Sequence, residues 1–297
     1  MAKVLVTGAT GNIGARVVAG LRDRDVPVRA FVRDPERARA RLGAATELAH
    51  GDFAEPDSLR RAVDGADRLF LLCANDPRQV EFGTNAVDAA VRAGVERVVM
   101  LSTIGAAAGS PTVFFDQHGR LEDHVRASGI PSTVLRAAHL MSNILGSAPT
   151  IRQAGRFFLP AGDAPIAMVD PRDVAAAAVA ALAEPAGAEP GGRTYELTGP
   201  AAITYGEVAE RLTAAVGRPV EYVPVPDEAA VDGMVQAGLP QWLAEQVVEV
   251  FRDLRTGTHG STSAGVRSLT GHEPRAFEDF AHAVVAPALD APEEGLT

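Results

Sequence analysis

The 297-residue sequence predicts an α/β protein built on a parallel β-sheet. Short runs rich in β-branched residues alternate with segments long enough for a helix, which is the pattern of repeated βα units. These runs are nearly continuous in apolar residues, as expected of strands that are buried on both faces. A glycine-rich turn, GATGNIG from Gly8 to Gly14, joins the first run to the first helical segment. Together these features predict a Rossmann-like, doubly wound sheet.

The elements of the first half follow one another in a regular order. Strands are expected at residues 4–6, 26–32, 69–72, 98–101 and 133–135, and helices at 14–24, 36–42, 56–63 and 80–93. Each of these helices is long enough to cross from one parallel strand to the next, and such crossovers are right-handed.

The regular alternation ends near residue 140. A stretch rich in glycine and proline (147–165) precedes an expected strand at 166–169 and an alanine-rich, buried helix at 174–183. A smaller βαβ-like unit is expected from a strand at 194–197, a helix at 204–216 and a strand at 220–223, followed by helices at 227–237 and 240–254. By composition, residues 184–193 form a flexible surface loop.

We therefore expect a Rossmann-like domain at 1–145 and a smaller C-terminal α/β part at 146–290. Within the smaller part, residues 166–183 are expected to return to the main sheet. Residues 291–297 are expected to form a flexible tail.

Charge and cysteine content exclude several classes of protein. The 38 acidic residues outnumber the 28 basic ones, and the formal net charge of −10 repels nucleic acid and anionic membranes, so we expect neither as a partner. The single cysteine, Cys73, cannot form an intramolecular disulfide, and the N-terminus does not resemble a signal peptide, so a cytoplasmic location is expected. The seven histidines show no zinc-ligand spacing, so no metal is expected.

The glycine-rich turn predicts a phosphate-binding site. Glycine allows a tight turn and a close approach to a phosphate, and the N-terminus of the following helix offers free N–H groups and positive potential. The spacing G-x-x-G-x-x-G differs from the G-x-G-x-x-G fingerprint, but the strand before it and the helix after it supply the expected context. A turn without a ligand is the alternative. The residues predicted to bind a dinucleotide here are Gly8, Thr10, Gly11, Asn12, Ile13 and Gly14.

Arg33 ends the second strand, where a protein that binds NAD usually places an acidic residue. A guanidinium at this point would pair with the 2′-phosphate of NADP. The alternative is a surface arginine, with Asp34 as the ribose partner. However, Asp34 followed by Pro35 also predicts a helix N-cap, so NADP is favoured.

The sequence resembles the NmrA-like group of atypical short-chain dehydrogenases over nearly its whole length. The resemblance rests on the glycine-rich turn, Arg33, Gly51-Asp52-Phe53, Ser102-Thr103, the VDPRDV segment at 169–174, YELTG at 195–199, LTG at 269–271 and PRAF at 274–277. Within this group, residues 116–130 are most similar to NADPH-dependent quinone oxidoreductases.

The resemblance implies further contacts with NADPH. Asp52 and Phe53 would lie against the adenine, and Cys73, Ala74 and Asn75 would line the ribose and nicotinamide, with Ser102 also at the cofactor. Asp52 could instead cap the helix that begins near Pro56, and Cys73 could be a buried apolar residue.

The usual catalytic pair of short-chain dehydrogenases, a tyrosine with a lysine four residues later, is absent, because the only lysine is Lys3. By the resemblance, His118 and Glu122 occupy the corresponding positions, one helical turn apart. They are the candidate catalytic residues, and the alternative is a helix pair without a catalytic role. Reduction of a quinone needs less acid assistance than reduction of a ketone, because a phenolate-like oxygen with a pKa of about 10 tolerates its charge.

The expected substrate is a small aromatic or quinone-like molecule, bound by Thr103, His139, Met141 and Phe157. The pairs Phe114-Phe115 and Phe157-Phe158 are expected on connections that wall the cleft, with core packing as the alternative.

The resemblance thus implies an NADPH-dependent reductase that transfers hydride to a quinone or a related conjugated aromatic carbonyl. Two alternatives are a non-catalytic NADP-binding redox sensor of NmrA-like type and a natural-product pathway reductase or isomerase. A homodimer is compatible with each of them.

Overall fold

The computed structural model describes residues 2–183 and 192–290. The predicted tail at 291–297 and most of the predicted loop at 184–193 lie outside the described residues. The chain forms two compact units, each built from discontinuous segments. The first comprises Met1–Ala137, Pro171–Leu197 and Gly265–His272, and the second Ala138–Asp170, Thr198–Ala264 and Glu273–Thr297.

The first unit is built on a seven-stranded parallel sheet with the strand order β3-β2-β1-β4-β5-β6-β8. The strands are β1 (Val4–Val6), β2 (Val28–Val32), β3 (Glu47–His50), β4 (Arg68–Leu71), β5 (Arg97–Thr103), β6 (Ser132–Ala137) and β8 (Arg193–Leu197). The chain adds strands first on one side of β1 and then on the other, so the sheet is doubly wound. This order confirms the predicted Rossmann-like fold.

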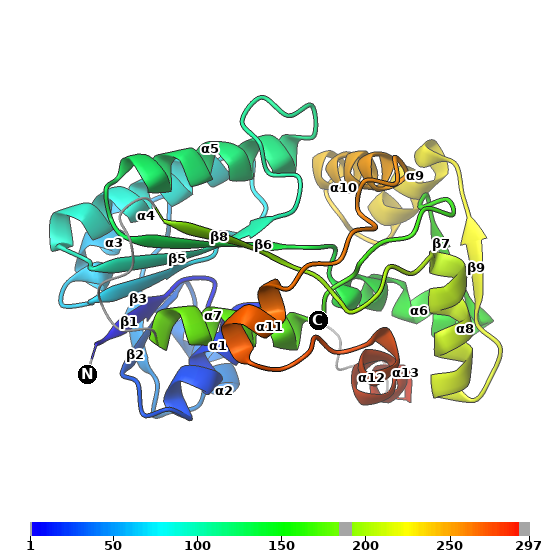
Figure 1. The fold of residues 1–297 in the computed structure, drawn as a ribbon, viewed down its shortest axis with the longest axis horizontal. Coiled ribbons are helices and arrows are strands. Elements are labelled where there is room, and N and C mark those ends of the chain that lie inside the picture. Colours follow the sequence, from blue (N-terminus) through cyan, green and yellow to red (C-terminus); the bar gives the residue numbers. More distant parts are fainter. Residues whose placement is uncertain (1, 184–191, 291–297) are drawn as a thin grey trace. The chain divides into compact units, whose positions relative to one another are not determined.

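Helices cover both faces of this sheet (Figure 1). One face carries α3 (Pro56–Val63), α4 (Gln79–Ala93) and α5 (Val113–Ala127), and the other α1 (Asn12–Arg22), α2 (Pro35–Leu42), α7 (Pro171–Ala183) and α11 (Gly265–Thr270). A core cluster joins Leu5, Leu69 and Val98 of the strands to Leu59 and Val87 of the helices. Strands β1, β2, β4, β5 and β6 are buried for this reason, which explains their nearly continuous apolar sequences. The edge strands β3 and β8 are largely exposed.

The alanine-rich helix α7 packs closely against α1. A Cβ atom added at Gly20 of α1 would lie 3.0 Å from the side chain of Val179. At the C-terminal end of α7, Arg97 Nη1 donates to Ala181 O at 3.0 Å, and Arg68 donates to Leu182 O. The two arginines thereby satisfy carbonyl groups that the end of a helix leaves unpaired.

The second unit contains a two-stranded parallel sheet of β7 (Arg156–Leu159) and β9 (Glu221–Pro224). Its helices are η1 (Met141–Ser147), α6 (Ala148–Ala154), α8 (Tyr205–Val216), α9 (Asp227–Gln236), α10 (Gln241–Leu254), α12 (Phe277–Phe280), η2 (Ala281–Val285) and α13 (Ala286–Asp290). Of these, η1 is a 3₁₀-helix and η2 a π-helix. Buried side chains that include Phe157, Tyr205, Leu212 and Phe251 form its core.

Two predicted elements of the second half are wrong. Residues 166–169 form no strand but only isolated bridges, because their backbone N–H groups bond to three different segments: Ile166 to Ile203, Ala167 to His259 and Val169 to His139. The predicted βαβ-like unit at 194–223 is also wrong, since β8 joins β6 in the main sheet whereas β9 pairs with β7.

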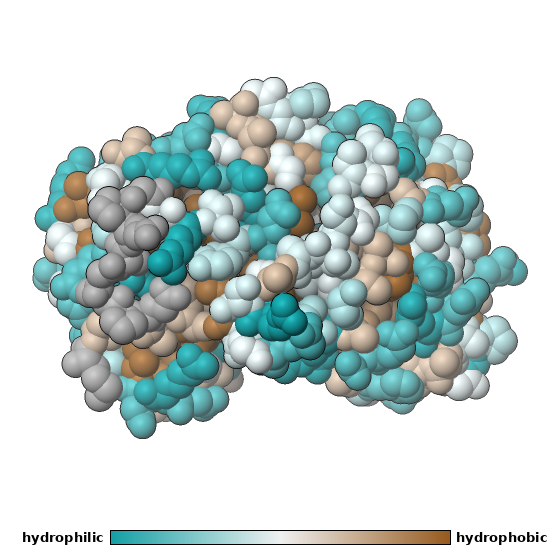
Figure 2. All heavy atoms as spheres, in the orientation of Figure 1, coloured by the Kyte–Doolittle hydropathy of each residue, from teal (hydrophilic) through white to brown (hydrophobic). Residues whose placement is uncertain are grey.

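No helix among the described residues is long and apolar enough to cross a membrane. On the face drawn in Figure 2, hydrophobic residues lie scattered among hydrophilic ones.

Candidate cofactor and catalytic site

The glycine-rich turn is held by close backbone packing. Gly8 has a φ of +61°, a conformation that favours glycine. A Cβ atom at Gly14 would lie 2.1 Å from the carbonyl oxygen of Gly8, so α1 could not approach the turn with any side chain there. Thr7 is buried; its hydroxyl donates to Phe70 O at 3.0 Å and accepts from Leu72 N at 2.9 Å. Thr7 thus ties the end of β1 to the end of β4, a role that the sequence analysis missed.

The N-terminus of α1 is available for an anion. Gly11 is its N-cap and provides no side-chain hydrogen bond, and the first turn contains no acidic residue. Within residues 2–183 and 192–290, the backbone N–H groups of Asn12, Ile13 and Gly14 have no acceptor. Unpaired N–H groups and the helix dipole attract phosphate. This geometry fits the pyrophosphate of a dinucleotide.

Arg33 and Asp34 have separate roles at the end of β2. The carboxylate of Asp34 accepts hydrogen bonds from the backbone N–H groups of Glu36 and Arg37, both at 3.0 Å, and so caps α2 as predicted. Arg33 is exposed and bonds to no other residue that the structure describes. Its guanidinium is therefore free to pair with a 2′-phosphate, and this fits NADP(H).

Asp52 and Phe53 follow β3. The carboxylate of Asp52 accepts from Ala54 N at 2.8 Å, whereas the N-cap of α3 is Glu55. The alternative in which Asp52 caps α3 is therefore wrong. The partly buried ring of Phe53 packs against Phe31 and Phe82, with ring centroids 5.5 and 6.1 Å apart.

The loop after β4 carries Cys73, Ala74 and Asn75. Cys73 is buried, and burial raises the pKa of its thiol to about 12. The thiol is therefore protonated at neutral pH and is not a nucleophile. Ala74 and Asn75 are exposed.

His118 lies on α5 with its Nε2 atom 3.3 Å from Nε2 of Gln79. Burial lowers the pKa of His118 to about 4, against a smaller opposing effect of the Glu122 charge. The ring is therefore neutral at neutral pH. Sequence reasoning missed Gln79, which belongs to no recognisable motif.

Glu122 is fully buried and is held by three side chains. Its Oε1 accepts from Ser102 Oγ at 2.6 Å and from Arg136 Nε at 2.9 Å, and its Oε2 accepts from Arg126 and Arg136, both at 2.7 Å. Burial raises the pKa of Glu122, but the hydrogen bonds from Arg136 and Ser102 and the charge of Arg136 outweigh burial and lower it. The carboxylate joins β5, β6 and α5, and no hydrogen bond links it to His118 among the described residues. The expected contact of Ser102 with the cofactor stays a prediction.

The residues expected to bind substrate are distributed between the two units. Thr103 of the first unit donates to Ile104 O at 3.2 Å. In the second unit, His139 Nε2 lies 2.9 Å from the hydroxyl of Tyr205, and burial lowers the pKa of His139 to about 4. Met141 lines a cavity of about 30 Å³. The assignment of these residues to a substrate stays a prediction.

The two phenylalanine pairs were expected on connections, but they lie in α5 and β7. Phe114 and Phe115 lie in α5 and are buried, because α5 begins at Val113. Phe157 is fully buried in β7, where its ring stacks on Tyr222, whereas Phe158 is 45% exposed. This geometry favours the core-packing alternative for Phe157, although its substrate contact is not tested.

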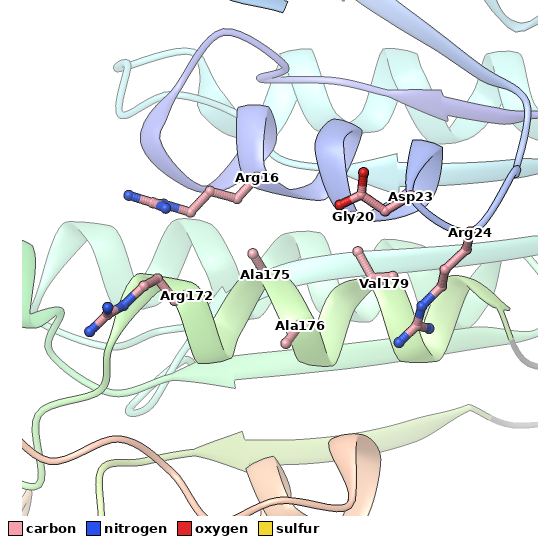
Figure 3. Close-up of a pocket in the computed structure, with 8 residues that line it drawn as sticks. All are labelled: Arg16, Gly20, Asp23, Arg24, Arg172, Ala175, Ala176 and Val179. Atoms are coloured by element: carbon pink, nitrogen blue, oxygen red, sulfur yellow. The ribbon is translucent and has the colours of Figure 1, made fainter. Parts of the chain in front are cut away.

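A separate groove of about 450 Å³ lies between α1 and α7. The small residues Gly20, Ala175 and Ala176 leave this space, with Arg16 and Arg172 at one end and Arg24 at the other (Figure 3). None of the predicted site residues lines it.

Comparison with known proteins identifies the family. The NmrA-like family matches residues 1–281. The chain belongs to the NmrA-like family. It is 37% identical over 283 residues to the NAD(P)H azoreductase of Xenophilus azovorans, with 95% of this chain and 98% of the relative covered. It is 39% identical over 278 residues to the (4-alkanoyl-5-oxo-2,5-dihydrofuran-3-yl)methyl phosphate reductase of Streptomyces griseus, with 93% and 96% covered.

The chain is also similar to a solved structure of an oxidoreductase. The NADPH-dependent quinone oxidoreductase QOR2 of Escherichia coli, complexed with NADPH, is 30% identical to this chain with a TM-score of 0.83. The match covers 94% of this chain and 98% of that one.

In this NmrA-like protein, the candidate cofactor residues follow consecutive parallel strands. The glycine-rich turn follows β1, Arg33 follows β2, Asp52 and Phe53 follow β3, and Cys73 follows β4. Open α/β sheets bind ligands at the carboxyl ends of their strands, so a dinucleotide is expected at this edge. The individual contacts with the cofactor stay predictions.

Proposed function

We propose that this protein transfers a hydride from NADPH to a quinone or a related conjugated aromatic carbonyl. The chain is an oxidoreductase that uses a nicotinamide cofactor, as its family and its relatives indicate. The choice of NADPH is supported by Arg33, which is free of partners among the described residues. The family does not specify the acceptor, so the choice of a quinone needs a separate argument.

The burial of His118 supports the choice of acceptor. Burial lowers the pKa of this ring to about 4, and Glu122 is bonded to two arginines, so neither candidate residue is a charged acid near neutral pH. A ketone reduced here would leave a strongly basic alkoxide with no charged acid from His118 or Glu122 to protonate it. A quinone leaves a phenolate-like oxygen with a pKa of about 10, which is stable long enough to take a proton from water.

The reaction balances as NADPH, one proton and a quinone giving NADP⁺ and a hydroquinone. When bound, reduced nicotinamide supplies the hydride, which carries both electrons. The N–H groups at the start of α1 would hold the pyrophosphate, and Arg33 would hold the 2′-phosphate. The quinone receives its second hydrogen as a proton from water.

A second candidate follows from the identity of 39% to the Streptomyces reductase. The name of that enzyme describes a carbonyl conjugated to an unsaturated furanone ring. An acceptor of this class would place the protein in a natural-product pathway and would use the same cofactor site. A third candidate, the redox sensor, requires NADPH binding without turnover.

NADPH absorbance distinguishes the three candidates when it is followed over time with a quinone, an azo dye and a 2-furanone. The proposal predicts multiple turnovers with the quinone. Turnover with the furanone alone would establish the second candidate instead. Tight binding of NADPH, seen by its fluorescence, without oxidation by any acceptor would establish the sensor.

A further inference from the structure

Three buried polar atoms lie in the first unit, where α4 begins beside α5. None of them has a hydrogen-bond partner among the described residues. They are Oε1 of Gln79, Oε1 of Gln117 and Nδ1 of His118. The exposed fractions of Gln79 and Gln117 are 1% and 6%. Buried polar groups are nearly always satisfied, so such a cluster needs an explanation.

Hydrogen bonds place these side chains around one turn of backbone. The carbonyl oxygen of Asp76 accepts from the backbone N–H of Gln79 at 2.9 Å and from the side-chain amide of Gln117 at 3.0 Å. The side-chain amide of Gln79 then reaches Nε2 of His118 at 3.3 Å. The turn that follows Asn75 is thus fastened to α5, the helix that carries His118.

Nε2 of the Gln79 amide faces the ring of His118, and this orientation assigns the ring nitrogen that carries the proton. An amide nitrogen can only donate, so Nε2 of His118 must accept. A neutral imidazole has one N–H group, which must then be at Nδ1. This Nδ1–H is one of the three atoms without a partner. Glu122, the charged group that acts on His118, makes its hydrogen bonds to Ser102 and two arginines instead.

We propose that Gln79 is a positioning residue, which fixes His118 as the neutral Nδ1–H form and directs that group to the substrate oxygen that gains negative charge. The second part rests on the proposed function. A hydrogen bond from neutral imidazole stabilises a developing phenolate without transferring a proton. The arrangement therefore suits an acceptor whose reduced oxygen is a weak base.

The tautomer can be read directly from ¹⁵N NMR spectra of the histidine rings at neutral pH, without substrate or turnover. The His118 signal is assigned as the one missing from His118→Gln. We expect a protonated Nδ1 and an unprotonated Nε2 in the wild-type protein. Gln79→Glu keeps the side-chain volume but supplies a carboxylate that can only accept, so it should move the proton to Nε2. A wild-type ring protonated at Nε2, or a tautomer that does not change in Gln79→Glu, would overturn the assignment.

Kinetics test whether Gln79 acts through His118. His118→Ala should slow quinone reduction about tenfold to a hundredfold, and Gln79→Met about tenfold, with the KM for NADPH unchanged. In the His118→Ala background, Gln79→Met should cause no further loss. Gln246→Met is the matched control, since Gln246 also has a buried Oε1 without a partner in the described chain but lies in the second unit.

The outcomes separate this inference from the proposed function. Losses that multiply in the double variant would show that Gln79 does not act through His118. No turnover with any acceptor would remove the proposed function and the substrate contact of Nδ1–H together. The tautomer assignment would still be tested by the ¹⁵N spectra, which do not depend on turnover.

Discussion

At the scale of single residues, Arg33 and Asp34 determine the expected cofactor. The Asp34 carboxylate already accepts two backbone hydrogen bonds at the start of α2, so it is a poor partner for ribose hydroxyls. Arg33 makes no competing bond to the described residues and is exposed. A free guanidinium beside a capped helix favours a phosphate over a hydroxyl.

Arg33→Ala should therefore weaken NADPH far more than NADH. A charge-assisted hydrogen bond contributes roughly 1.5–3 kcal/mol, so the Kd for NADPH should rise by about one to two orders of magnitude. Arg41→Ala removes the same charge from the far end of α2 and is the control. Fluorescence titration with both cofactors measures the effect, and an equal loss for both would refute the assignment.

At the scale of elements, the turn between β1 and α1 contains one glycine that the fold requires and another that we expect cofactor binding to require. Gly11 has an ordinary φ of −76°, and a Cβ atom there would meet only Gly8 O at 3.2 Å. Gly14 instead faces the backbone of the turn, with 2.1 Å between its Cβ position and the same oxygen. The two glycines should therefore respond differently to the same substitution.

Gly11→Val should abolish dinucleotide binding in a folded protein, because the side chain occupies the space that the pyrophosphate needs. Gly14→Val should disrupt the turn and lower the melting temperature. Calorimetry and cofactor titration of both variants test this pair of outcomes. Wild-type affinity for NADPH in Gly11→Val would mean that the phosphate binds elsewhere.

Glu122 joins β5, β6 and α5, so its replacement should mainly lower the free energy of unfolding. Glu122→Gln removes the buried negative partner of Arg136 and leaves Arg126 paired, among the described residues, only with the exposed Asp123, so it should cost about 3 kcal/mol. The control is Glu47→Gln, since Glu47 pairs with Arg29 but its side chain is 46% exposed, so its loss should cost about 0.5 kcal/mol. Urea unfolding gives both values. A stable Glu122→Gln protein with no activity would instead indicate a catalytic role.

Local sequence patterns predicted the main sheet well and the second unit less well. Strands β1, β2, β4, β5 and β6 are nearly continuous apolar runs, and the turns and helices between them carry their own signals. The edge strand β3 was not among the expected strands, because it is short and none of its residues is buried. β7 was missed because its four residues follow a glycine-rich stretch and its partner β9 is distant in sequence. The apolar run at 166–169 has the composition of a strand, but composition does not show that its N–H groups bond to three separate segments.

Contacts between distant segments were also missed at the candidate site, whereas local patterns were recognised. The glycine-rich turn and the Asp34 cap are local patterns, so the sequence predicted the geometry of both. Gln79 and His118 are 39 residues apart, and Thr7 reaches across to β4, so neither contact is visible in a motif. Side chains that act through partners in another element become evident only when the fold brings the elements together.

At the scale of the whole molecule, two neutral histidines make stability depend on pH. Burial lowers the pKa values of His118 and His139 from an ordinary 6.5 to about 4. As the pH falls from 6.5 to 4, the unfolded chain binds protons at these positions and the folded protein does not. Protons therefore favour unfolding in this range, and stability should fall with falling pH.

Urea midpoints measured at about pH 7.5 and about pH 5 should show this loss in the wild-type protein. The double variant His118→Gln/His139→Gln should lose less stability over the same interval. His282→Gln, which changes an exposed histidine, is the control and should behave as the wild type. The same loss in the double variant as in the wild type would show that these two rings are not responsible.

The most direct test of the whole account is a single-turnover experiment with NADPH deuterated at the carbon that donates the hydride. Stopped-flow mixing of the protein–NADPH complex with a quinone should give one hydroquinone for each NADPH oxidised, and deuteration should slow the transfer. A complex that keeps its NADPH reduced after mixing with quinone would contradict hydride transfer as the function of this protein.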